Sequence, residues 1–179
     1  MIVFLDFEAS SLNKKSFPIE VAWVFENGFE ASRLIRPAPD WLDWSEDAER
    51  IHGISRLRLQ QEGVCVEDVA TLMMDQLSGH DLYTSAPSWD GKWLSILLRA
   101  AGRPRHALRL KKSDHAFLRR AQAEAKGMIG EPELLELVEG VISETEQTPP
   151  AHRALADARL ERERLERVLD KVRAYVASA

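Results

Sequence analysis

The stretch MIVFLDFEAS, residues 1–10, decides the fold of this chain, because an apolar run ends there in two carboxylates. Its β-branched and aromatic residues are typical of a buried β-strand. Asp6 and Glu8 lie two residues apart, so on a strand both side chains point to one face, with roughly 6.5 to 7 Å between the Cα atoms. Neighbouring carboxylates repel each other unless a cation lies between them. The stretch therefore predicts a strand that ends in a metal-binding pair.

Two later segments carry side chains of the same kind. Asp90 follows Trp89 in SWDGKWL, at the start of an amphipathic pattern, and His152 and Asp157 lie in AHRALADA. Four carboxylates can bracket two metal ions about 3.5 to 4 Å apart, a separation that stabilises both the attacking and the leaving oxygen of a phosphoryl displacement. Each segment alone is a weak signal. Together they predict a two-metal phosphodiesterase site.

In this order the motifs resemble those of the DEDDh group of 3′→5′ exonucleases, which includes the proofreading subunit of bacterial DNA polymerase III and ribonuclease T. The first motif is matched by Asp6 and Glu8, the second by Asp90, and the third by His152 and Asp157. RIHGIS, residues 50–55, and PIEVAWV, residues 18–24, also resemble stretches of the family. The resemblance implies an α/β, ribonuclease-H-like fold, with a central mixed five-stranded sheet flanked by helices, in a single exonuclease domain over residues 1–179.

The resemblance also implies an activity. The chain would be a 3′→5′ exonuclease that releases nucleoside 5′-monophosphates from single-stranded DNA or RNA ends. The four carboxylates would hold two Mg²⁺ or Mn²⁺ ions, which are hard cations that prefer oxygen ligands. His152 would act as the general base that takes the proton from the attacking water.

Two departures from the family pattern concern the substrate rather than the metals. The usual D-x-E-T-T-G is DFEASS at residues 6–11, and Ala86 stands four residues before Asp90, where the family often has asparagine. We expect Ala9, Ser10 and Ser11 to lie beside the terminal nucleotide. His52 either lines the same cleft or packs locally at the end of its helix, and the second interpretation is the more common fate of a lone histidine.

Positive charge is concentrated in one segment. The net charge of the chain is −5, which argues against a protein that coats nucleic acid, because such binding depends on many contacts from Lys and Arg to phosphates. Residues 99–120, however, contain eight Lys or Arg residues against the single acid Asp114. We expect the substrate backbone to contact four of them, Arg105, Arg109, Lys111 and Lys112. The alternative is a solvated surface that offsets acidic neighbours.

Length and composition set wider limits. A chain of 179 residues suits one domain with a sizeable core, and the single Cys65 excludes an internal disulfide framework and fits a reducing compartment. The sequence contains no apolar run long enough for a membrane span and no signal-peptide pattern at its start. We expect a soluble, cytoplasmic monomer or homodimer that binds single-stranded nucleic-acid ends and no membrane.

Periodicity and turn signals predict the order of elements. The expected strands are residues 1–9, 16–26, 29–37, 81–87 and 106–110, and the expected helices are residues 45–52, 66–79, 89–101, 114–126, 132–144 and 153–177. We expect Ser45 to cap the first helix and Gly53 to follow its end. The apolar stripe expected on the last helix is Leu165, Val168, Leu169, Val172 and Val176. Pro149 and Pro150 cannot continue a helix, so we expect His152 on a loop or first turn and Asp157 one turn inside the last helix. Among the tryptophans, Trp23 and Trp93 fit the core, whereas Trp41 and Trp44 could stack on bases.

Two other classes of protein remain open. One is a catalytically silent nucleic-acid-binding or assembly module of the same fold, although a pure binder has no reason to keep four mutually repelling acids. The other is an endonuclease with a ribonuclease-H-like fold, which does not need the spacing between His152 and Asp157. No motif distinguishes DNA from RNA, because that choice depends on contacts to the 2′-hydroxyl group.

Overall fold

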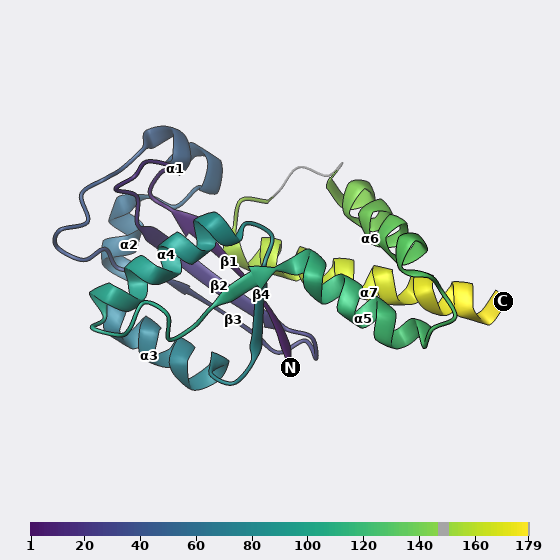
Figure 1. Cartoon of the computed structure of the whole chain (residues 1–179). Coiled ribbons are helices and arrows are strands. Elements are labelled where there is room, and N and C mark those ends of the chain that lie inside the picture. Colours follow the sequence, from purple (N-terminus) through teal and green to yellow (C-terminus); the bar gives the residue numbers. More distant parts are fainter. Residues whose placement is uncertain (147–150, 179) are drawn as a thin grey trace.

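Five strands form one mixed sheet in the computed structural model, which describes residues 1–146 and 151–178 (Figure 1). The order across the sheet is β3-β2-β1-β4-β5. The strands are β1 (Ile2–Ala9), β2 (Pro18–Phe25), β3 (Glu30–Leu34), β4 (Asp81–Thr84) and β5 (Leu110–Lys112). β2 is antiparallel to β1 and β3, and β4 is parallel to β1 and β5. The predicted α/β fold with a mixed five-stranded sheet is confirmed.

Strand β1 is central because both of its faces are apolar. Val3, Leu5 and Phe7 point into one hydrophobic core, and Ile2 and Phe4 point into another on the opposite face. Since side chains alternate along a strand, the residues at positions 6 and 8 continue the face of Ile2 and Phe4. The two carboxylates of β1 therefore extend a core-facing row to the end of the strand.

Helices cover both faces of the sheet. α3 (Val66–Leu77) and α4 (Pro87–Ala100) pack on the face of Val3 and Leu5, and α5 (Ser113–Ala125), α6 (Glu131–Glu146) and α7 (Ala154–Ser178) pack on the face of Ile2 and Phe4. In Figure 1 these last three helices extend together to one side of the sheet. The buried stripe of α7 is the predicted one, made by Leu165, Val168, Leu169 and Val172. It brings the first turn of α7 to the carboxyl end of β1.

Two short helices close the other end of the molecule. In α1 (Glu46–His52), the Ser45 side chain accepts a hydrogen bond from the Ala48 backbone, and Gly53 ends the helix with a left-handed φ of 67°, as predicted. α2 (Arg56–Glu62) was not predicted. Its signals were the N-cap Ser55 and the Arg58–Glu62 pair, but a helix of 7 residues with only Leu59 buried has too short an apolar pattern to detect.

The prediction of the fifth strand was wrong in position. Residues 106–109 form turns rather than a strand, and the backbone N–H of Ala107 donates to the carbonyl oxygen of Pro104 at 3.0 Å. The ladder begins at Leu110, which pairs with Leu82, because the partner strand β4 has only 4 residues. Most other boundaries differ by one to three residues. Pro149 and Pro150 lie outside the described residues.

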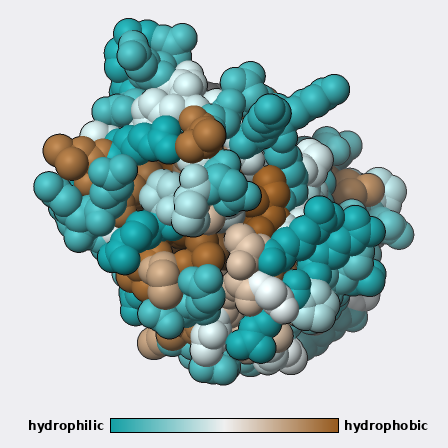
Figure 2. Space-filling model, turned by 90° about the vertical axis from the view of Figure 1, so that its left-hand side faces the viewer, coloured by the Kyte–Doolittle hydropathy of each residue, from teal (hydrophilic) through white to brown (hydrophobic). Residues whose placement is uncertain are grey.

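The surface near α1 and α2 is mixed. Figure 2 shows hydrophobic residues interspersed with hydrophilic ones over this end of the molecule. Large exposed hydrophobic side chains include Leu12, Leu42, Ile51 and Leu57. Within the described part of the chain, none of the helices combines the length and the hydropathy needed to span a membrane.

We predict opposite effects of two Gly→Ala substitutions on stability. A Cβ at Gly63 would lie 2.3 Å from the Leu59 carbonyl oxygen and 2.6 Å from the Arg36 backbone nitrogen, so Gly63→Ala should destabilise by about 1 to 3 kcal/mol through overpacking. Gly140, inside α6, has no atom within 4 Å of that position, so Gly140→Ala should stabilise by about 0.5 to 1 kcal/mol. Urea denaturation measures both changes, and an equal effect of the two would contradict the packing around Gly63.

Candidate active site

Three carboxylates from distant parts of the sequence meet at the carboxyl end of β1. Asp6 and Glu8 come from β1, and Asp157 comes from the first turn of α7. One oxygen atom from each of the three lies within 4.8 Å of the others. This convergence is the arrangement that the first and third sequence motifs predicted for these residues.

Asp90 lies beside this trio without belonging to it. It is buried in the first turn of α4, where its carboxylate accepts a hydrogen bond from the hydroxyl group of Thr84, the last residue of β4. Its negative charge raises the pKa of Asp6, so the two carboxylates are electrostatically coupled. The structure thus gathers all four predicted acids at one end of the sheet.

Burial makes these carboxylates reluctant to ionise. The pKa of Asp6 is raised well above its ordinary value, first by burial and then by the charges of Asp90, Glu8, Asp157 and Glu161. Burial also raises the pKa of Glu8 to about 8 and that of Asp90 to about 7. For Asp90, the hydrogen bond from Thr84 offsets part of the rise in pKa. A divalent cation would relieve this repulsion, and an all-oxygen donor set is the kind that Mg²⁺ and Mn²⁺ prefer.

A fifth acid at this site, Glu161, lies outside the predicted motifs. It lies four residues after Asp157 on α7, so both side chains are on one face of the helix, and this spacing was the signal that could have found it. Its side chain is buried, and one carboxylate oxygen accepts a hydrogen bond of 2.5 Å from Arg164. Burial is the largest of the effects that raise its pKa.

Glu20 on β2 was also missed, and it fixes the start of α7. Its carboxylate accepts two hydrogen bonds from the Arg153 guanidinium, at 2.8 and 3.1 Å, and a third from the Ala154 backbone at 3.1 Å. Glu20 is buried and pairs across the ladder with Glu8. An acid in the otherwise apolar stretch PIEVAWV was the available signal, because a buried charge requires a partner.

His152 lies just before α7, as predicted. It is exposed and has a left-handed φ of 50°, a conformation that costs a non-glycine residue of order 1 to 3 kcal/mol and persists where the surroundings hold it. The next residue, Arg153, donates its backbone N–H to Asp157 at 3.2 Å. His152, Asp6 and Asp157 line one cavity of about 360 Å³ together with Glu161 and Arg164. The histidine and the acids therefore share one space.

The expected nucleotide-contacting residues after β1 are largely buried. Ser10 and Ser11 both direct their hydroxyl groups to Asp43, and the Ser10 hydroxyl oxygen also accepts from the Phe17 backbone at 3.1 Å. These hydroxyl groups hold the loop after Ala9 in place.

His52 shows features of both interpretations. It is buried at the end of α1, and its Nδ1 accepts a hydrogen bond of 3.1 Å from the Ile54 backbone, which is local packing. Its Nε2 is buried without a hydrogen-bond partner among the described residues. Burial lowers the pKa of His52, and Glu20, Arg153 and His152 are close enough to contribute. The unpartnered nitrogen therefore lies near the start of α7.

The four basic residues proposed for the substrate backbone lie at two different places. Lys112 ends β5 beside Thr84 and forms an ion pair with Asp114, which is the main cause of its raised pKa, and the charge of Glu161 adds a smaller contribution. Lys111 forms an ion pair of 2.8 Å with Asp81, the first residue of β4. Arg105 and Arg109 precede β5, at the end of the sheet opposite the acids. The structure thus brings only Lys112 to the acidic end.

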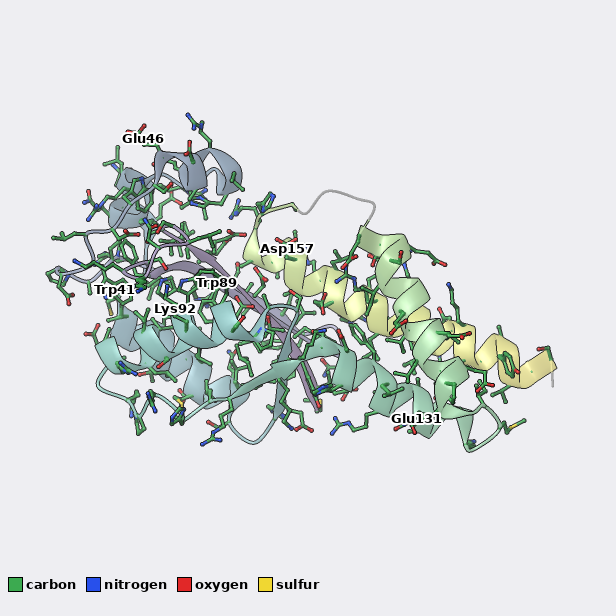
Figure 3. All side chains as sticks on the ribbon, turned by 45° about the horizontal axis from the view of Figure 1, so that its top comes forward. Trp41, Glu46, Trp89, Lys92, Glu131 and Asp157 are labelled. Carbon is green, nitrogen blue, oxygen red and sulfur yellow. The ribbon has the colours of Figure 1, made fainter. Side chains whose placement is uncertain are left out.

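An exposed tryptophan stands next to the acids on α4. The ring of Trp89 stacks on Trp93 with 5.6 Å between centroids, and the Lys92 ammonium lies 5.1 Å from the Trp89 ring. Lys92 donates to the Asn13 carbonyl oxygen and to Ser16. Figure 3 shows Trp89 and Lys92 between Asp157 and Trp41. Trp93 and Trp23 are buried, as predicted, and Trp41 packs against Phe17.

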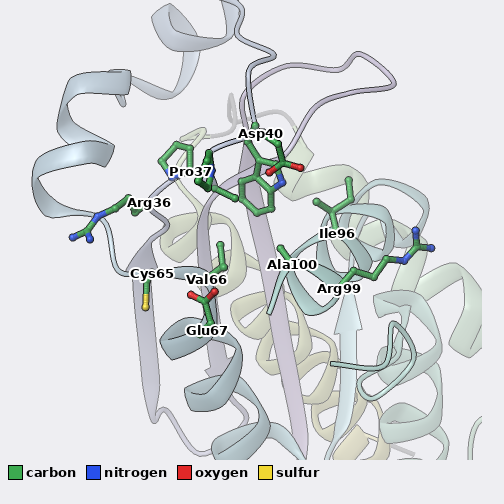
Figure 4. A pocket seen from close by; sticks show the side chains of 12 residues that line it. Arg36, Pro37, Asp40, Cys65, Val66, Glu67, Ile96, Arg99 and Ala100 are labelled. Carbon is green, nitrogen blue, oxygen red and sulfur yellow. The ribbon is translucent and has the colours of Figure 1, made fainter. Parts of the chain in front are cut away.

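A second hollow, of about 720 Å³, lies away from the acids. It is formed by the loop after β3, the start of α3 and the end of α4 (Figure 4). Its charged side chains are Arg36 and Arg99 against Asp40 and Glu67, so the two signs balance. It lacks the convergent carboxylates of the smaller cavity, and we place the chemistry at the smaller one.

Comparisons with known proteins find similarity in structure. No protein-family model matches the chain, and no curated protein sequence matches it. Exonuclease I of E. coli in complex with a dA16 oligonucleotide has a TM-score of 0.67 at 14% identity, over 98% of this chain and 42% of that chain. The zinc-bound complex of the same enzyme with single-stranded DNA has a TM-score of 0.66 at 15% identity, over 99% of this chain and 42% of that chain. A moderately thermophilic exonuclease I from Methylocaldum szegediense has a TM-score of 0.63 at 20% identity, over 97% of this chain and 42% of that chain.

These similarities concern the fold. Nearly the whole of this chain superimposes on 42% of each exonuclease I chain, so it spans less than half their length. The shared sheet and flanking helices confirm the predicted ribonuclease-H-like fold.

The raised pKa values predict how the stability of the metal-free protein depends on pH. A carboxyl group with a raised pKa in the folded state contributes stability that is complete below its unfolded pKa, about 4, and is lost as pH rises through its folded pKa. With Glu8 at about 8 and Asp90 at about 7, the free energy of unfolding in EDTA should fall between about pH 5 and pH 8. Mn²⁺ should reverse the fall.

Two variants control this measurement, which uses urea denaturation at several pH values. Glu8→Gln should flatten the pH dependence, and Glu163→Gln, at an exposed acid on α7, should leave it unchanged. Asp6→Ala should be at least as stable as the parent protein without metal. A strongly destabilised Asp6→Ala protein would show that the acid serves the fold.

Proposed function

We propose that this protein is a metal-dependent 3′→5′ exonuclease that releases nucleoside 5′-monophosphates from single-stranded DNA or RNA ends. The observation that carries the proposal is the convergence of Asp6, Glu8 and Asp157, with Asp90 beside them, at one end of a ribonuclease-H-like sheet. The solved exonuclease I complexes with single-stranded DNA and oligonucleotides support the choice of substrate. They share the fold with this chain at low identity.

The carboxylates would hold two divalent cations, Mg²⁺ or Mn²⁺. Asp6, Glu8 and Asp157 are near enough to one another to share a cation, and Asp90 lies close enough to Asp6 to serve a second. Bound cations would lower the pKa of the attacking water and stabilise the negative charge on the leaving 3′-oxygen. The protein contributes the ligands in a site where burial strengthens every charge interaction.

His152 is the general base in this proposal. It is exposed at the edge of the cavity that Asp6 and Asp157 line, so its imidazole can reach a water there. The exposed position lets the accepted proton pass to solvent. Asp157, held by the Arg153 backbone N–H, stays in place while the histidine takes and releases protons.

Several residues are proposed to bind the substrate. Ala9, Ser10 and Ser11 would lie beside the terminal nucleotide, and His52, whose Nε2 is buried and has no partner among the described residues, would line the same cleft. We assign Lys112 to the first phosphates of the incoming strand, and Lys111, Arg109 and Arg105, along the edge strand and the turn before it, to phosphates farther from the 3′ end.

A catalytically silent binding module is the alternative. That alternative has a physical cost, because a binder would keep four mutually repelling acids, three partly buried and one buried, without using them. An endonuclease of the same fold would use the same acids but would cut at internal positions. One assay separates all three.

We predict shortening from the 3′ end. With 5′-labelled single strands of DNA and of RNA, the protein should produce a ladder of progressively shorter products in Mg²⁺ or Mn²⁺ and none in EDTA, and Asp6→Asn or Asp157→Asn should abolish it. Blunt duplexes should react more slowly, since each terminal step must be unpaired at roughly 1.4 kcal/mol. Discrete internal cuts would establish an endonuclease, and a mobility shift without cleavage would establish a binder.

His152→Ala tests the base separately. We expect the turnover rate to fall by about 10² to 10⁴-fold with little change in metal affinity, because removal of a general base leaves the ligands intact. The remaining rate should rise with pH as hydroxide replaces the base. Unchanged turnover at neutral pH would exclude His152 from catalysis.

A further inference from the structure

We propose that Glu20 keeps a cation of the chain itself out of the metal site. By binding the Arg153 guanidinium, it prevents this positive charge from pairing with Glu8 and leaves Glu8 free to bind a divalent cation. Glu20 is thus a positioning residue, which contacts neither the metal nor the substrate. This role rests on the proposed function, because Glu8 is a metal ligand in that proposal.

Glu8 and Glu20 project from the same face of the sheet. They are direct partners in the antiparallel ladder of β1 and β2. Residues opposite each other in such a ladder have Cβ atoms about 4.5 to 5.5 Å apart, and like charges at these positions repel each other. Burial and the charges of Asp157 and Glu20 raise the pKa of Glu8. A positive group beside this pair can therefore bind either carboxylate.

Arg153 is the positive group beside the pair, and it binds Glu20. Its Nη2 donates to one carboxylate oxygen at 2.8 Å and its Nε donates to the other at 3.1 Å, the bidentate geometry of a strong Arg–carboxylate pair. The described residues include no ion pair between Arg153 and Glu8. The charge of Arg153 nevertheless offsets part of the rise in the pKa of Glu8, so the guanidinium lies near Glu8 without binding it.

The carboxylate of Glu8 is directed to the other acids instead. Its side chain makes no hydrogen bond within the described part of the chain, and one of its oxygens lies within 4.8 Å of oxygens of Asp6 and Asp157. A guanidinium bound to Glu8 would occupy these oxygens and would repel a divalent cation. Arginine cannot escape this conflict by losing its proton. The metal site therefore requires that Arg153 be held elsewhere, and Glu20 holds it.

Glu20 also anchors the start of α7, and the two roles predict different results. The Ala154 backbone N–H donates to Glu20 at 3.1 Å, and the Arg153 backbone N–H donates to Asp157 at 3.2 Å. If anchoring were the whole role of Glu20, removal of the Arg153 side chain could not repair the loss of the Glu20 charge. If Arg153 competes for Glu8, its removal eliminates the competitor.

The test is the binding of Mn²⁺ to metal-free protein, followed by the EPR signal of free Mn²⁺. Glu20→Gln keeps the shape of the side chain and an oxygen for the Ala154 N–H, and it removes the charge that holds Arg153. We expect Mn²⁺ affinity to fall by about 10- to 100-fold, the loss typical when a residue that orients metal ligands is replaced. Adding Arg153→Met, which keeps the backbone N–H donated to Asp157, should restore most of the affinity.

The chain offers a matched control at another Arg–Glu pair between α7 and the sheet. Arg159 binds the carboxylate of Glu30 through Nε and Nη2, as Arg153 binds Glu20. Glu30 pairs with Val24, near the opposite end of β2 from Glu20. Glu30→Gln, alone and with Arg159→Met, should bind Mn²⁺ as the parent protein does.

Two results would overturn the proposal. Unchanged Mn²⁺ affinity in Glu20→Gln would show that Arg153 does not compete for Glu8. A loss that persists after Arg153→Met is added would make Glu20 an anchor of α7 only. The double variant carries neither charge of the pair, so it also excludes an effect of a lone charge left in the fold.

Strand degradation separates this proposal from the proposed function. In Glu20→Gln, the Mn²⁺ concentration for half-maximal rate should rise with the loss of affinity, and the rate at saturating Mn²⁺ should stay close to that of the parent protein. If the parent binds Mn²⁺ but degrades no strand, the proposed function fails and the binding comparison still decides the role of Glu20. If the parent is active and Glu20→Gln binds Mn²⁺ equally well, only the role of Glu20 fails.

Discussion

Repulsion among partly buried carboxylates is the constraint on which the rest of this structure depends. Asp6, Glu8 and Asp157 have oxygens within 4.8 Å of one another, and Asp90 and Glu161 add to the negative charge that Asp6 experiences. Such a cluster is unfavourable in an apolar interior unless protons or cations neutralise it. A divalent cation bound at this end of the sheet would relieve that repulsion.

The acids are held by elements that the core fixes independently. β1 is buried on both faces, and the apolar stripe of α7 packs on the face that ends in Asp6 and Glu8. Around the acids, two Arg–Glu pairs neutralise the remaining buried charges, one at Glu20 and one at Glu161. The core thus positions the acids, and the Glu20 pair holds Arg153 and Ala154, the two residues that follow His152.

Local patterns in the sequence predicted much of this arrangement. The alternation in β1 placed Asp6 and Glu8 on one face, the cap at Ser45 and the glycine at position 53 bounded α1, and the position of His152 ahead of the last helix was confirmed. The same reasoning missed α2, misplaced β5 and overlooked Glu20 and Glu161. Glu20 and Glu161 each had a local signal, but the contacts that explain them are not local: Glu20 pairs with Arg153, 133 residues away, and Arg164, the partner of Glu161, also bonds Thr145 on another helix.

The sequence by itself determined the chemistry available to this protein: four acids and a histidine in an order and spacing that suit a two-metal site. Only the tertiary structure decided which groups meet. It brought Asp157 to Glu8, placed Asp90 behind the trio on Thr84, and paired Lys111 with Asp81 at the far end of the sheet while Lys112 stayed near the acids. The physical reason is that periodicity assigns a residue to a face of its own element, whereas strand register and helix packing, set by the buried apolar side chains, determine which faces come together.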